Sequence, residues 1–69
     1  MGISKVREFL EEILKRKGYN ERVADNEYLY PVYLSSLEVV ELLLLVDKEK
    51  NEYNVSKLDI NEITLEKLV

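Results

Sequence analysis

Apolar residues near the N-terminus recur every three or four positions, which is the spacing of one face of an α-helix. This stripe consists of Val6, Phe9, Leu10, Ile13 and Leu14, and Ile3 can extend it. A basic run, 15–17, follows the stripe and precedes Gly18. Cations favour the negative end of a helix dipole, and glycine readily adopts the left-handed conformation that ends a helix. The pattern therefore predicts a first helix that stops at Gly18.

Residues 19–34 show no sustained period. Asp25 indicates a turn, Pro31 restricts Tyr30 to an extended conformation, and the stretch 21–24 permits a short helical turn. A connection of this length needs side chains that fix it to the core. We expect these side chains to be Leu29, Val32 and Leu34, with Tyr28, Tyr30 or Tyr33 packed flat on the surface.

A second helix is predicted at 36–50, and it is apolar nearly all round. Ser35 can be its N-cap, with Glu38 three positions later reaching back, which is the pattern of a capping box. We expect Leu37, Val40, Leu44 and Val46 to face the core. The segment also contains Val39, Leu42, Leu43 and Leu45. Because so small a domain cannot enclose a helix on every side, some of these residues either widen the core contact, form a homodimer seam or serve a partner.

The C-terminal segment is predicted to be short and irregular. Tyr53 and Val55 alternate with polar residues in an extended link, and the segment 56–59 can cap a single short turn. This turn takes apolar contacts from Leu58, Ile60 and Ile63. Thr64 can then cap a closing helix that begins at Leu65. The pattern as a whole predicts an all-α protein with a long first loop.

Composition narrows the classes of function. The 69 residues form one domain, 1–69, without cysteine or histidine, so the common thiol nucleophile, general base and metal ligands are missing. We therefore expect no enzyme and no metal site. The net charge of −4 disfavours nucleic-acid binding, and the basic run 15–17 is better explained as a helix end. The longest apolar run, 39–46, is too short to span a bilayer, and we expect a cytoplasmic protein.

The start of the second helix contains the most specific motif. The sequence Ser35-Ser36-Leu37-Glu38-Val39-Val40-Glu41-Leu42 resembles the D-S-L-x-x-V-E-L signature of acyl and peptidyl carrier proteins. The family also has a long first loop, and T-L-E-K-L-V at 64–69 is similar to the T-V-x-x-L-A that opens the last helix of many carrier domains. Ser35 stands where the family has aspartate, and Tyr33 stands where it has a small residue.

The resemblance implies a right-handed helical bundle of the acyl-carrier type with a short third helix. It implies that Ser36 carries 4′-phosphopantetheine, on which a freestanding carrier holds acyl or aminoacyl groups as thioesters. A phosphopantetheinyl transferase and acyl-transfer or synthase enzymes would then be its partners, and the carrier would be a monomer. We expect partner recognition by Glu38, Glu41, Leu43 and Asp47, with the acids presenting one negative stripe to basic surfaces.

Two other hypotheses remain open from the residues alone. Ser35 and Ser36 can form a plain helix start, and the acids can be an ordinary solvated face. A small acidic helical adaptor would then use the leucine-rich second helix as a docking or dimer surface, without a prosthetic group. A carrier-like regulatory subunit that binds an enzyme permanently is the third hypothesis.

Overall fold

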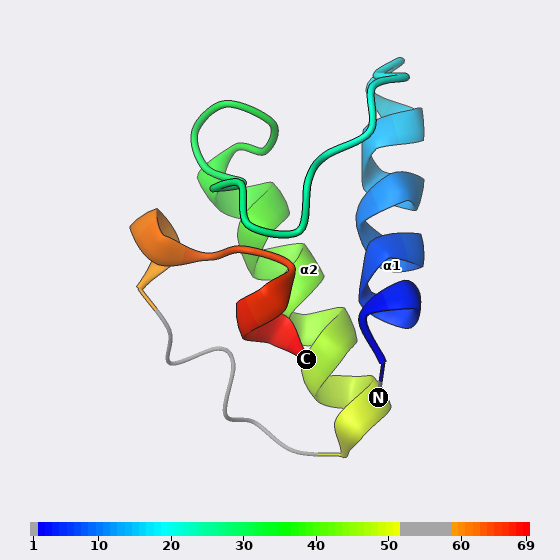
Figure 1. Ribbon diagram of the computed structural model, residues 1–69, viewed down its shortest axis with the longest axis vertical. Helices are drawn as coiled ribbons and strands as arrows, with labels where there is room; N and C mark the ends of the chain where they lie inside the picture. The colour runs from blue at the N-terminus through cyan, green and yellow to red at the C-terminus, as the bar shows by residue number, and fades with distance from the viewer. Residues whose placement is uncertain (1, 52–58) are drawn as a thin grey trace.

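Two antiparallel α-helices form the frame of the protein. The computed structural model describes residues 2–51 and 59–69, and within these ranges it contains helices and turns but no β-strand. Helix α1 spans Ile3–Arg16 and helix α2 spans Ser36–Lys50, and both agree with the ranges predicted from the sequence. Figure 1 shows α1 and α2 side by side and running in opposite directions. The end of α1 therefore lies near the start of α2.

Helix α1 ends as the sequence predicts. Gly18 has a φ of 77°, a left-handed conformation that L side chains rarely adopt. Its N–H donates to the carbonyl of Lys15, and the N–H of Tyr19 donates to the carbonyl of Leu14. This pair of bonds is a Schellman motif, which satisfies carbonyls at the end of the helix. The motif turns the chain out of α1 and into the long first loop.

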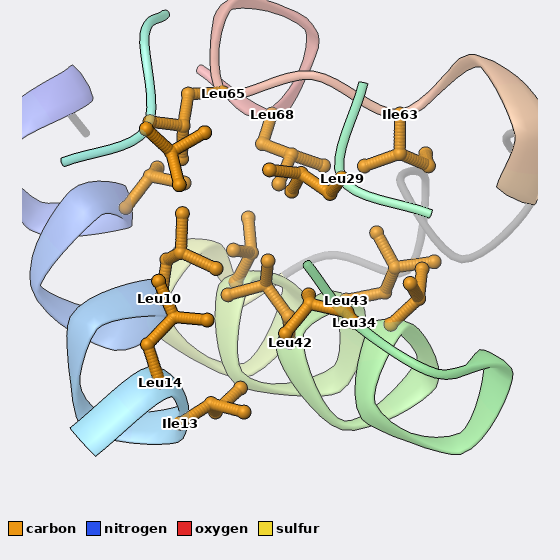
Figure 2. Close-up of a cluster of buried hydrophobic side chains, with 14 residues drawn as sticks. Leu10, Ile13, Leu14, Leu29, Leu34, Leu42, Leu43, Ile63, Leu65 and Leu68 are labelled. Atoms are coloured by element: carbon orange, nitrogen blue, oxygen red, sulfur yellow. The ribbon is translucent and has the colours of Figure 1, made fainter. Parts of the chain in front are cut away.

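The core lies between the two helices and a layer formed by the first loop and the C-terminal segment. Figure 2 shows side chains of α1 and α2 facing side chains of that layer, among them Leu29, Ile63, Leu65 and Leu68. Helix α1 buries Val6, Leu10, Ile13 and Leu14, while Phe9 is half-buried at the edge. The apolar stripe predicted for the first helix is therefore confirmed.

The rotational phase predicted for α2 is wrong. The buried residues of this helix are Val39, Leu42, Leu43, Val46 and Asp47. Three of the four residues expected to face the core are instead exposed: Leu37 by 81%, Val40 by 47% and Leu44 by 53%. The sequence did not determine the phase because apolar residues occur all round this helix, so the position of α1 and of the loop layer decides which of them are buried.

The side chains that fix the first loop differ in part from those that the sequence indicates. Leu29 and Leu34 are fully buried, as expected, but Val32 is 72% exposed. Tyr30 and Tyr33 pack at the edge of the core, and Tyr28 is exposed. Residues 21–24 form no helical turn, and Val23 of this irregular segment is buried in the core.

Polar contacts connect the first loop to helix α1 and to the C-terminal segment. The guanidinium of Arg7 donates to the Val23 carbonyl at 2.6 Å and forms an ion pair with Asp25. The Asp25 carbonyl in turn accepts from the N–H of Glu66, 3.1 Å away. Loop, helix α1 and C-terminal segment are thereby connected at one point.

Residues 59–69, the part of the C-terminal segment that the structure describes, contain two single turns, η2 (Ile60–Glu62) and η3 (Glu66–Leu68). Asp59 caps the first through the N–H of Asn61, and the Thr64 hydroxyl accepts from the N–H of Lys67. The N-cap of η3 is Leu65, one residue after the predicted cap Thr64, and the closing segment is one 3₁₀ turn and not an α-helix. The link predicted at Tyr53 and Val55 and the cap predicted at Ser56 lie outside the described residues.

Candidate functional site at the start of helix α2

The candidate site begins with the N-cap of α2. The Ser35 hydroxyl accepts from the N–H of Glu38 at 3.3 Å, and a Glu38 carboxylate oxygen accepts from the N–H of Ser35 at 2.8 Å. These two reciprocal bonds form the capping box that the sequence predicts. The box fixes the direction in which the chain enters the helix, and so it fixes the position of the next residue.

That next residue is Ser36, the first residue of α2, and it is exposed. Its hydroxyl takes no part in the capping box, because Ser35 is the residue that caps the helix. Backbone N–H groups and the positive end of the helix dipole lie at this end of α2, and both favour a phosphate group. Ser36 is therefore an accessible hydroxyl on a rigid base.

Next to Ser36 lies an exposed row of aliphatic side chains, which we call the apolar strip. It consists of Leu37, Val40 and Leu44. Residues three and four positions apart lie on the same side of a helix, so the three side chains follow one another along the solvent face of α2. The observed rotation of α2 thus leaves at the surface three large apolar residues that were expected to lie in the core.

The two acids of the first turns of α2 are both paired with cations from the end of α1. Lys17 lies 2.9 Å from Glu38, and Arg16 forms an ion pair with Glu41. Lys17 also donates to the Tyr33 carbonyl at 2.6 Å, so one ammonium group connects α1, the first loop and α2. The pKa of Glu38 is lowered, first by the hydrogen bond from the Ser35 N–H and then by that from Lys17.

The expected negative stripe is not formed. Asp47 is only 1% exposed, and it makes an interaction inside the protein. Leu43, which was expected to contact partners, is 5% exposed and belongs to the core. Of the four residues predicted for partner recognition, only Glu38 and Glu41 reach the surface, and each is held by a cation.

Tyr33, the bulky residue shortly before Ser36, is anchored in the first loop. Its ring packs edge-on against Tyr19, with 5.6 Å between the ring centres, and its hydroxyl donates to Glu27. The hydrogen bond to Glu27, followed by burial, raises the pKa of Tyr33 to about 12. The ring therefore has partners in the loop that hold it in place beside the start of α2.

The sequence did not identify Arg16 and Lys17 as members of this site. Both belong to the basic run at the end of α1, which the helix dipole was sufficient to explain. The missing information was the antiparallel arrangement of the helices, which places the end of α1 beside the first turns of α2 (Figure 1).

Comparisons of the chain with models of protein families, with curated proteins and with solved structures found no match. In the part of the chain that the structure describes, no group of three or more acidic side chains is arranged to hold a metal ion. Neither of the two described α-helices is long and apolar enough to cross a membrane.

Proposed function

We propose that the protein is a carrier that bears 4′-phosphopantetheine on Ser36 and presents acyl or aminoacyl groups to partner enzymes. The observation that carries this proposal is the position of Ser36, an exposed hydroxyl at the first residue of α2 with an unused apolar strip beside it. The cytoplasmic location and the acyl-carrier type of bundle, with a short third helix, belong to the same proposal.

The residues around Ser36 fit a phosphodiester at this position. The start of α2 offers backbone N–H groups to an anion. Glu38, the carboxylate in the same turn, is compensated by Lys17, so the added phosphate does not meet an uncompensated negative charge there. The Tyr33 ring is held by Tyr19 and Glu27 in the loop.

The arm would supply the thiol that the chain lacks, since it contains no cysteine. Each part of α2 then has a separate task. Ser35 and Glu38 fix the helix start, Ser36 Oγ provides the ester oxygen, and the apolar strip provides a surface for the enzymes that use the carrier.

Attachment of the arm is chemically simple for this chain. Ser36 Oγ forms a bond to the phosphorus of the pantetheine phosphate in coenzyme A. The pyrophosphate bond breaks and adenosine 3′,5′-bisphosphate leaves, while the hydroxyl proton passes to a base of the transferase. The chain therefore needs only an accessible hydroxyl that a partner can approach.

Intact mass after co-expression tests the proposal. The protein is produced together with a broad-specificity phosphopantetheinyl transferase, and its mass is compared with that of protein produced alone. We expect an increase by the mass of one phosphopantetheine. An unchanged mass under conditions that modify a known carrier would contradict the proposal.

The apolar strip also favours one other function. A small helical adaptor would use Leu37, Val40 and Leu44 to bind a protein partner directly, without a prosthetic group. Ser36→Ala separates the two functions, because an adaptor would keep its partner and a carrier would lose its activity.

A further inference from the structure

The charged residues that border the apolar strip are not all acidic, although the protein as a whole has a negative net charge. Leu37, Val40 and Leu44 extend for about 10 Å along the helix, at 1.5 Å per residue. Lys48 follows Leu44 by four positions and is exposed, so a cation lies on the same side of the helix at the far end. The strip is therefore a small aliphatic surface with a positive charge at its C-terminal end.

The acids beside the strip are already paired with cations of the protein itself. Glu41 is paired with Arg16, and Glu38 is paired with Lys17 and also bonded to the N–H of Ser35. A basic side chain of a partner would compete with these cations for carboxylates that already have charge-assisted hydrogen bonds. It would also approach Arg16 and Lys17 themselves, which lowers the gain from any new pair.

We infer that the partner enzymes of this carrier bind the strip through an aliphatic or aromatic surface, and not through a cluster of basic residues. The inference rests on the proposed function, since it concerns the enzymes that act on Ser36. The charge balance at the start of α2 leaves apolar burial as the main source of affinity. Its strength then depends on the side chains of the strip and little on ionic strength.

Transfer kinetics with a phosphopantetheinyl transferase test this inference. The value of kcat/KM for arm transfer is measured at about 0.01 M and about 0.15 M salt, where the Debye length is about 30 Å and 8 Å. We expect Val40→Ala and Leu44→Ala to lower kcat/KM about three- to tenfold at both salt concentrations, because each removes apolar contact area. We expect Glu41→Gln to stay within about twofold of the wild type at both.

Matched controls exist for both kinds of change. Val32→Ala truncates the same side chain as Val40→Ala at an exposed position in the first loop. Glu66→Gln removes the same charge as Glu41→Gln from the C-terminal turn, so it reports the effect of net charge alone. Both controls are expected to match the wild type, and the helix content of every variant is verified by circular dichroism.

Two results would overturn the inference while leaving the carrier function intact. One is a loss of severalfold or more in Glu41→Gln at low salt that disappears at high salt. The other is full activity of Val40→Ala and Leu44→Ala. A wild-type protein that accepts no arm at either salt concentration would instead contradict the proposed function itself, and the inference with it.

Discussion

The ammonium group of Lys17 lies 2.9 Å from a carboxylate oxygen of Glu38, and this ion pair joins the end of α1 to the first turn of α2. The same carboxylate closes the capping box through the N–H of Ser35. Glu38 therefore supports the local start of the helix and its packing against α1 at the same time.

Because of these two contacts, we expect the contribution of Glu38 to the free energy of unfolding to depend on pH. The folded protein lowers the pKa of Glu38, so the stability that its charge contributes is complete above the pKa of the unfolded chain, about 4.5. That stability is lost as the pH falls through the lower pKa of the folded state. Urea unfolding of wild type and Glu38→Gln should show a difference that is constant near neutral pH and shrinks below about pH 4. A difference that does not change in acid would contradict the assigned contacts.

The two serines are predicted to differ in their effect on stability. Ser35→Ala removes the side chain that accepts from the Glu38 N–H and should cost about 1 kcal/mol of unfolding free energy. Ser36→Ala lies beyond the cap and should change the unfolding free energy by less than about 0.5 kcal/mol. Chemical denaturation measures both. Equal losses in the two variants would mean that the cap is assigned to the wrong residue.

Neighbouring valines of α2 test the helix phase. Val39→Asp places a carboxylate in the core and should cost about 3 kcal/mol or more. Val40→Asp places the same group on the exposed apolar strip and should cost about 0.5 kcal/mol or less. Thermal melting distinguishes them at once. A more severe effect at Val40 would restore the phase predicted from the sequence and remove the strip.

The contacts of Arg7 predict how the first loop is held. Arg7→Gln loses the bond to the Val23 carbonyl and the ion pair with Asp25, and should cost about 1–3 kcal/mol, as expected for charged hydrogen bonds of a partly buried group. Arg22→Gln, which removes the same charge from an exposed loop residue, should be nearly neutral. Equal stability of the two variants would show that Arg7 does not secure the loop.

Local signals predicted the elements well. Gly18 marks the end of α1 through its left-handed conformation, and Ser35 with Glu38 marks the start of α2 through the capping box. Each of these signals depends on residues close together in the chain. Ser36 was placed correctly as the first residue of α2 for the same reason, since a cap fixes the residue that follows it.

Features that depend on distant residues could not be predicted. The pairing of Arg16 with Glu41 joins positions 25 residues apart and requires the helices to be antiparallel. The burial of Leu43 and the exposure of Leu44 depend on where the loop layer lies, because both are leucines within one apolar run. Val32 was misplaced similarly: it is exposed, and Val23 is buried together with Leu29 and Leu34.

The most direct test of the central claim is the stoichiometry of arm transfer to purified protein. Wild type, Ser35→Ala and Ser36→Ala are incubated with coenzyme A and a broad-specificity phosphopantetheinyl transferase, together with a known carrier as internal control, and their intact masses are measured. We expect one phosphopantetheine on the wild type and on Ser35→Ala, and none on Ser36→Ala. An unmodified wild type beside a fully modified control, or a modified Ser36→Ala, would contradict it.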